Sequence, residues 1–444
     1  MIENFHPPLI PDNMKKIVVF IVIVFFAARL FAQDEPPQYK VAAARFEKFY
    51  NANMPESISK KFSPEMKAAL PPEKFKETTT LLKSQLGTLQ KTGFLKYNSP
   101  LAVYKATFQN GVFLLNISLN NKNELIGLVL SPYQETSKTD QIKIDPSLTE
   151  SPVLLKTLSG TISGTLTTPK NAGGKIPVVL IIAGSGPVDR NGNSPKLGLA
   201  TNDYLLMAEA LGKNGIASLR YDKRMIGESV GTVKEENLKF DDYVDDAIGL
   251  INLLKEGGRF SKIIVLGHSE GSLVGILASN ASETNVNGFI SVAGAGRPAD
   301  ELLTEQMKAQ PQYLADAFKN IMDSLRRGRV QKKVDPSLYF IIRPSIQGYL
   351  MSWCRFDPQR EIKKLKIPVL IIQGTTDLQV TVADADKLKK GKSSANEIII
   401  HGMNHVLKDA PPERDKNMAT YNQPDLPLNS ELVTGVIDFI HGLK

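Results

Sequence analysis

Short apolar runs alternate with stretches of helical spacing after about residue 157. Each run has the length of a strand and lacks the alternation of a half-exposed one, so we expect strands buried on both faces. The expected strands are 177–182, 216–220, 263–266, 288–293, 368–372 and 397–400, with helices at 204–213 and 241–255. This alternation predicts an α/β fold with a mostly parallel, doubly wound sheet over residues 151–444.

The stretch 297–366 interrupts this rhythm with a mostly helical pattern. It lies between two expected strands, one ending at residue 293 and the next beginning at 368. The carboxyl ends of parallel strands form the ligand-binding edge of such a sheet, so we expect this insertion to cover that edge as a helical cap.

Residues 38–143 follow a different pattern. Phe46, Phe49 and Tyr50 are spaced as one helix face, and 75–89 has the spacing of a second helix. Alternating apolar positions then predict antiparallel strands at 101–108, 111–119 and 125–130. We predict a small α+β domain without recognisable chemistry, followed by a polar linker at 137–145.

The N-terminus is typical of a signal peptide. Lys15 and Lys16 precede an apolar run at 17–26, and small residues end at Ala32, after which we expect cleavage. Residues before Met14 have the pattern of an upstream extension, and translation could begin at Met1 or Met14. An uncleaved anchor is the alternative, although Arg29 interrupts the run. We therefore expect export to the periplasm or beyond, with membrane contact through this segment before cleavage.

The composition of the chain narrows the range of possible functions. The chain of 444 residues is 42% hydrophobic and 23% charged, as in ordinary globular proteins. Its net charge of +8 is spread out, without the basic run interleaved with aromatics that a nucleic-acid surface requires. Cys354 is the one cysteine, which excludes an intramolecular disulfide. The sequence has no H-E-x-x-H motif or Cys/His cluster, so no metal or other cofactor is expected.

Residues 267–271 read Gly-His-Ser-Glu-Gly, a G-x-S-x-G turn between a buried strand and a helix. The turn is so tight that the residues two before and two after the serine must lack side chains, as Gly267 and Gly271 do. Ser269 is thereby presented at a helix N-terminus, where backbone N–H groups favour a developing anion. We predict that Ser269 is a catalytic nucleophile.

A serine nucleophile needs a base, which we look for among the five histidines. His6 precedes the signal peptide, His268 adjoins the nucleophile and His441 belongs to the terminal helix. His405 lies in a loop just past the last strand, whereas His401 ends that strand and is expected to be structural. We therefore predict His405 as the base.

The imidazole of His405 needs a carboxylate to orient it. Asp377 follows the strand that precedes the histidine's strand and is the predicted acid. Asp384 and Asp386 are competitors, but they fall in a helical pattern and are expected to be surface charges. The catalytic order along the chain is then Ser, Asp, His.

An oxyanion hole needs two backbone donors. The N–H of Glu270 should supply one and the loop after 178–182 the other, with Ser185 as the candidate and Gly186 as the alternative. A dinucleotide-binding loop is excluded because Asp189 occupies the third glycine position.

These motifs resemble bacterial secreted α/β-hydrolases of the carboxylesterase type, which are similar to monoglyceride lipases and serine aminopeptidases. The likeness covers 159–444 and, more loosely, 38–143. It rests on 184–193, 220–224, 267–271, 343–345, 374–377 and 402–405. The resemblance implies an α/β-hydrolase fold and esterase activity on short acyl esters. Met225 departs from it, since such proteins usually have glycine there.

Three functions stay open on these residues. The first is a cofactor-free esterase that cleaves small short-to-medium acyl esters through an acyl-enzyme. The second is an aminopeptidase or amidase with the same triad, in which Asp300, Glu301 and Glu305 would hold an amino group. The third is a periplasmic binding protein on a hydrolase scaffold. Within the cap, the candidate acyl-pocket residues are Trp353, Tyr349 and Phe340, for which plain cap packing is the alternative. The sequence predicts neither the physiological substrate nor the oligomeric state.

Overall fold

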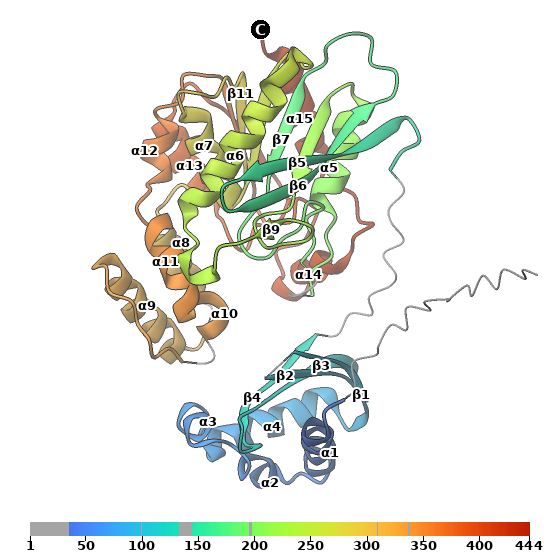
Figure 1. Cartoon of the computed structure of the whole chain (residues 1–444), viewed down its shortest axis with the longest axis vertical. Coiled ribbons are helices and arrows are strands. Elements are labelled where there is room, and N and C mark those ends of the chain that lie inside the picture. Colours follow the sequence, from blue (N-terminus) through green and yellow to red (C-terminus); the bar gives the residue numbers. More distant parts are fainter. Residues whose placement is uncertain (1–34, 99, 133–143, 195–197, 309, 336–337) are drawn as a thin grey trace, which may run out of the picture. The chain divides into compact units, whose positions relative to one another are not determined.

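The computed structural model describes residues 35–98, 100–132, 144–194, 198–308, 310–335 and 338–444. The chain divides into two compact units, Met1–Tyr133 and Gln134–Lys444 (Figure 1). The predicted signal peptide and extension at 1–32 lie outside the described residues, as does most of the linker predicted at 137–145.

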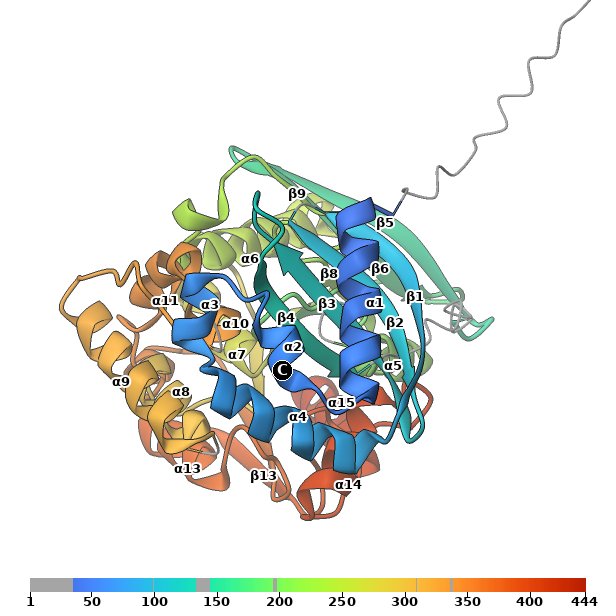
Figure 2. The same ribbon diagram turned by 90° about the horizontal axis from the view of Figure 1, so that it is seen from below.

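The first unit packs helices on one antiparallel sheet. Helix α1 lies across the sheet, whose strand order is β1-β2-β3-β4 (Figure 2). Phe46, Tyr50, Phe62 and Tyr104 are among the buried side chains that join the two layers. The elements are α1 (Pro37–Asn51), α2 (Pro55–Ser59), α3 (Pro64–Ala69), α4 (Pro72–Leu86), β1 (Leu89–Asn98), β2 (Leu101–Phe108), β3 (Gly111–Leu119) and β4 (Leu125–Pro132).

The spacing of apolar residues did not predict the first strand of this unit. The helix expected at 75–89 ends at Leu86, and β1 begins at Leu89. Between them Gly87 has φ +71°, a left-handed conformation that lets the chain turn directly from helix to strand.

The second unit is built on a mixed sheet with strand order β13-β12-β11-β10-β7-β8-β6-β5. Neighbours from β13 to β8 pair in parallel, whereas β6 pairs antiparallel with both β8 and β5. The strands are β5 (Leu148–Thr157), β6 (Gly160–Pro169), β7 (Val178–Ile182), β8 (Ala217–Tyr221), β9 (Val230–Gly231), β10 (Ile263–His268), β11 (Gly288–Val292), β12 (Val369–Gly374) and β13 (Asn396–Ile400). The α/β fold predicted from the sequence is confirmed.

Helices cover both faces of this sheet (Figure 1). Helices α5 and α15 bury their apolar residues against one face, and α6, α7 and α13 against the other. The helices outside the cap are α5 (Asp203–Lys213), α6 (Phe240–Lys255), α7 (Glu270–Asn280), α13 (Val382–Gly391), α14 (Arg414–Ala419) and α15 (Ser430–Gly442). Burial on both faces explains why β7, β8, β10, β11 and β12 are continuous buried runs.

The strand order reverses between β7 and β10. After β7 the chain adds β8 on one side, and it later returns to add β10 on the other side of β7. The pairing of Gly267 with Ile182 brings the loops that follow these two strands next to each other. Such a switch point is where open α/β sheets bind their ligands.

The stretch between β11 and β12 forms a group of helices, as the sequence predicted for 297–366. They are α8 (Ala299–Met307), α9 (Gln312–Arg326), α10 (Tyr339–Ile342), α11 (Gln347–Trp353) and α12 (Pro358–Ile362). We call residues 297–366 the cap. Two contacts tie its beginning to the segment after β12: Arg297 pairs with Asp384 at 2.8 Å, and Gln306 Nε2 donates to the Gln379 carbonyl at 3.0 Å.

Within the described ranges, the helices are too short or too polar to cross a membrane.

Candidate active site

Ser269 lies in a strained turn between β10 and α7. Its backbone has φ +53° and ψ −120°, a region that side-chain-bearing residues rarely adopt. A Cβ at Gly267 would lie 2.2 Å from the Gly271 carbonyl oxygen, and one at Gly271 would lie 2.3 Å from the carbonyl oxygen of Ile182. Both glycines are therefore required by close backbone contact, which is the physical reason for the G-x-S-x-G pattern.

Asp377 and His405 are brought together from the loops after β12 and β13. His405 Nδ1 lies 2.9 Å from Asp377 Oδ2, and both side chains are almost fully buried. Asp377 Oδ1 accepts the backbone N–H groups of Gln379 and Val380 at 2.7 and 2.9 Å. Burial opposes ionisation of Asp377, but the contact with His405 and these hydrogen bonds outweigh it and leave its pKa below the ordinary value. The carboxylate is thus kept charged beside the imidazole.

His268, the residue before Ser269, contacts His405. The ring of His268 lies 4.9 Å from that of His405, centroid to centroid, and His268 Nε2 lies 2.9 Å from the His405 carbonyl oxygen. Among the described residues, the Ser269 hydroxyl has no hydrogen bond to His405. Catalytic hydrogen bonds of this kind often form fully when substrate is bound.

The competing carboxylates and histidine have other roles. Asp384 is fully buried and pairs with Arg297, while its Oδ2 accepts from the Thr381 hydroxyl at 3.0 Å. The prediction that Asp384 is a surface charge is therefore wrong: its helical pattern could not reveal a partner about 90 residues away. Asp386 is exposed on α13, and His401 is exposed in the turn after β13.

A hydrogen-bond chain that the sequence did not reveal supports the histidine loop. The Gly184 N–H donates to the Tyr204 hydroxyl at 2.9 Å, and that hydroxyl lies 2.7 Å from His268 Nδ1. Since His268 Nε2 faces a carbonyl, it donates, and Nδ1 accepts from Tyr204. Burial lowers the pKa of His268 to about 3, so the ring stays neutral in this role.

The loop after β7 lies against the nucleophile. A Cβ at Gly184 would be 3.2 Å from Ser269 Cβ, and Ser185 lines the same pocket as Ser269. Because the Gly184 N–H is already bound to Tyr204, Ser185 offers the next backbone donor of this loop. In the described part of the chain, the N–H groups of Ser185 and Glu270 have no protein acceptor. Both predicted oxyanion donors therefore border the pocket.

Ion pairs join the loop after β8 to the loop after β7 and to helix α6, which explains the charged motifs of these loops. Arg190 pairs with Asp222 at 2.6 Å, and its backbone N–H donates to the same carboxylate at 2.7 Å. Arg224 binds Asp246 of α6 through two nitrogens, at 2.7 and 2.8 Å. Met225, where the resemblance led us to expect glycine, has φ +63°. The chain adopts the left-handed conformation at this position even without glycine.

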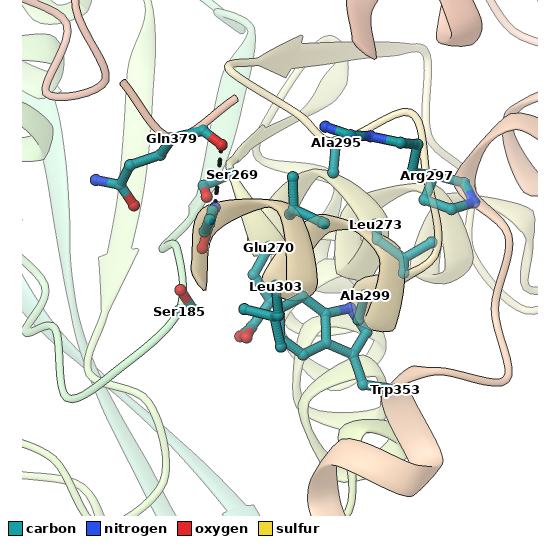
Figure 3. A pocket seen from close by; sticks show the side chains of 13 residues that line it. Ser185, Ser269, Glu270, Leu273, Ala295, Arg297, Ala299, Leu303, Trp353 and Gln379 are labelled. Carbon is teal, nitrogen blue, oxygen red and sulfur yellow. Dashed lines mark hydrogen bonds between the residues drawn. The ribbon is translucent and has the colours of Figure 1, made fainter. Parts of the chain in front are cut away.

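The pocket above Ser269 is walled by the cap (Figure 3). Its empty volume is about 440 Å³ including the opening to solvent. The apolar lining comes from Leu273, Ala295, Ala299, Leu302, Leu303, Trp353 and Pro358, and the polar lining from Ser185, Ser269, Glu270, Arg297, Gln306 and Gln379.

The three cap residues predicted for this pocket have different outcomes. Trp353 lines it. Tyr349 is not among the lining residues and packs against the rings of Trp353 and Tyr243, with centroids 6.1 and 5.6 Å away. Phe340 belongs to α10, and its side chain lies outside what the structure describes. The described residues contain no cluster of His, Cys, Asp or Glu able to hold a metal ion.

Comparison with known proteins agrees with this architecture. Residues 197–409 match the family described as serine aminopeptidase, S33, and residues 43–128 match a family of unknown function, DUF3887. Esterase EstD of Thermotoga maritima is 27% identical over 368 residues, covering 79% of this chain and 84% of that protein. That share of the chain exceeds the length of the second unit, so the match extends into the first.

Solved structures of similar proteins include esterases. Est1E from Butyrivibrio proteoclasticus, with ferulic acid bound, is 18% identical, with a TM-score of 0.43 and coverage of 61% of this chain and 96% of that one. The Pyrococcus furiosus esterase Pf2001 is 16% identical, with a TM-score of 0.42 and coverage of 67% and 94%. The observed sheet and these matches lead to one conclusion: the second unit has the α/β-hydrolase fold, and the chain is an enzyme similar to serine aminopeptidases and to Esterase EstD.

Proposed function

We propose that this enzyme hydrolyses carboxylic esters with short-to-medium acyl chains through an acyl-enzyme on Ser269, with His405 as base and Asp377 as acid. The observation that carries the proposal is the Asp377–His405 pair, 2.9 Å apart, at the sheet edge from which the strained Ser269 turn also projects. The relative from Thermotoga maritima is, by its name, an esterase.

Acylation begins with attack of Ser269 Oγ on the ester carbonyl carbon. His405 Nε2 takes the hydroxyl proton as the bond forms, and Asp377 stabilises the resulting imidazolium. The N–H groups of Glu270 and Ser185 bind the oxygen that becomes negative. The imidazolium then gives its proton to the alkoxide, which leaves as an alcohol.

Deacylation repeats these steps with water. His405 takes a proton from the water molecule while its oxygen attacks the acyl carbon of the ester on Ser269. The second tetrahedral intermediate collapses, Ser269 regains its proton from the imidazolium, and a carboxylic acid is released. Atoms and charges balance without any cofactor.

The acyl preference follows from the pocket lining. Leucine side chains and Trp353 line the wall that the cap contributes, an apolar surface suited to a hydrocarbon chain. Polar groups lie around Ser269 itself, where the reacting carbonyl would be bound. We therefore expect butyryl and hexanoyl esters to be better substrates than charged or very long ones.

The aminopeptidase alternative receives less support from the cap carboxylates. Asp300 is paired with Arg326, and Glu305 lies 2.7 Å from Lys308. Each already has a basic partner and is less able to hold a substrate ammonium group. The family name still requires that peptide amides be tested beside esters.

Labelling with a fluorophosphonate, followed by peptide mapping, tests the nucleophile. We expect modification at Ser269, its loss in Ser269→Ala, and turnover of p-nitrophenyl butyrate well above that of aminoacyl anilides. Preference for the anilides would favour the aminopeptidase. Absence of both labelling and turnover in folded protein would favour a binding protein.

We also propose that the enzyme acts after export, on the basis of the N-terminal pattern at residues 14–32. N-terminal sequencing of mature protein from the periplasm or medium tests this. We expect it to begin at Gln33.

A further inference from the structure

A buried lysine contacts the loop that borders the nucleophile. Lys223, in the segment after β8, is 3% exposed, and its Nζ donates to the carbonyl oxygen of Gly184 at 2.5 Å. The mechanism described above does not use this side chain. Burying an ammonium group is costly unless it is well paired, so Lys223 requires compensating groups around it.

Lys223 is compensated by groups from two other elements. Glu270 of α7 lies 3.6 Å away and is equally buried, and the Tyr243 ring of α6 faces the ammonium with its centroid at 5.2 Å. Burial lowers the pKa of Lys223, and the Glu270 carboxylate opposes that shift. The side chain thus has an ion pair, a cation–π contact and a hydrogen bond to backbone.

The contacted carbonyl belongs to the same peptide unit as a proposed oxyanion donor. The oxygen of Gly184 and the N–H of Ser185 are the two ends of one planar group, and in a trans peptide they point in opposite directions. A donor fixed on the oxygen therefore also fixes the direction of the N–H. A cation at the oxygen further polarises the unit and makes the N–H a stronger donor.

We propose that Lys223 is a positioning residue that holds and polarises the Gly184–Ser185 peptide so that the Ser185 N–H stabilises the oxyanion. This inference rests on the proposed function, because it assumes that Ser185 lies in the oxyanion hole of a Ser269 hydrolase. Lys223 acts through the peptide and not on substrate. It matters in the transition state, when the substrate oxygen carries its negative charge.

The size of the effect can be bounded. Removing a whole oxyanion donor typically lowers kcat by about 10²–10³-fold. Removing Lys223 leaves the Ser185 N–H present but weaker and less fixed, so we expect a smaller loss, about 10- to 100-fold in kcat. Ester binding before reaction should change little, since the ground-state carbonyl carries little charge.

The test uses Lys223→Met in the full chain, with p-nitrophenyl butyrate as substrate and an alkyl trifluoromethyl ketone as inhibitor. The ketone adds to the active serine and presents an oxyanion. We expect kcat to fall about 10- to 100-fold, the inhibition constant of the ketone to rise by a similar factor, and KM to stay within about threefold. A merely structural role would not link the first two changes.

Two further variants complete the design. Tyr243→Phe keeps the ring over Lys223 and alters the same buried cluster, so we expect its kcat to stay within about twofold of wild type. Lys223→Gln keeps a donor for the Gly184 carbonyl without the charge and should lose less activity than Lys223→Met. If the methionine variant does not fold, the glutamine variant carries the same comparison of kcat with ketone affinity.

Each outcome has a distinct meaning. A folded variant at Lys223 whose kcat or ketone affinity stays within about threefold of wild type overturns the inference, while wild-type labelling at Ser269 keeps the proposed function. Wild-type protein that is neither labelled at Ser269 nor active on esters overturns the proposed function itself.

Discussion

Replacing Asp377 with asparagine should disable the enzyme through the tautomer of His405. Asp377 Oδ1 accepts two backbone N–H groups, from Gln379 and Val380, and its Oδ2 faces His405 Nδ1 and Gln373 Nε2. An asparagine must keep its carbonyl oxygen toward the two backbone donors, because the opposite flip would set its NH₂ group against both. Its NH₂ group then faces His405 Nδ1.

That arrangement reverses the hydrogen bond. The amide donates to Nδ1, so the neutral imidazole carries its proton on Nε2 and cannot accept one from Ser269. The known cost of this substitution in other triads is about 10⁴-fold in kcat, which corresponds to about 5.5 kcal/mol of transition-state stabilisation. The new NH₂ group also meets the Gln373 donor at 3.1 Å in the native geometry, which adds a local loss of stability.

Steady-state kinetics on p-nitrophenyl butyrate, with thermal unfolding as a check of folding, measures the effect. Asp386→Asn is the matched control, since Asp386 is exposed on α13, and it should stay within about twofold of wild type. A loss below about 50-fold in folded Asp377→Asn would refute the tautomer reasoning. A loss of about 10⁴-fold in the kcat of Asp384→Asn would identify Asp384, and not Asp377, as the acid.

Three further predictions concern the loops and the cap. Met225→Gly should raise the free energy of unfolding by about 0.5 kcal/mol, because relief of the left-handed conformation slightly exceeds the added entropy of the unfolded chain. Urea unfolding checks this, and Met225→Ala, which keeps the strain, should give no gain. The Arg297 contact holds the pKa of Asp384 below its ordinary value although burial opposes this shift. Asp384 therefore stabilises the fold above about pH 4. This stabilisation is lost as the pH falls through the lower pKa that Asp384 has in the folded protein. Asp384→Asn should therefore cost about 3 kcal/mol at pH 7 and progressively less toward pH 3; a gap in unfolding free energy that does not narrow with acid would contradict this. Trp353→Ala should shift the best substrate toward longer acyl chains and lower stability by about 3 kcal/mol; an unchanged order of kcat/KM across acetyl to octanoyl esters would mean that Trp353 is a packing residue.

The sequence could predict features that depend on neighbours along the chain. The buried strands, the glycine-flanked Ser269 turn and the loop positions of Asp377 and His405 all follow from local periodicity and strand order. The hairpin β5–β6 was missed because serine and threonine occupy much of β6, as in Gly160–Pro169, and give no apolar run. Antiparallel strands of this kind depend on pairing partners rather than on their own hydrophobicity.

Contacts between distant segments could not be predicted. Tyr204 and His268 meet across 64 residues, and Lys223 reaches Gly184 across 39. Nothing in the spacing of either pair marks the contact, since each residue alone is compatible with ordinary packing. The charged run at 220–224 was one signal, because a dense group of charges beside a buried strand requires buried partners.

The two contacts between the cap and the segment after β12 limit which cap residues can be exchanged. The pocket's apolar wall is largely cap side chains, whereas the proposed catalytic groups stand on loops of the sheet. Substrate range can therefore be altered by exchanging cap residues without rebuilding the reacting groups. Arg297 and Gln306 are the exceptions, because they bind Asp384 and the Gln379 carbonyl close to Asp377. A cap transplanted from a related enzyme must reproduce these two contacts, or it will change the rate together with the specificity.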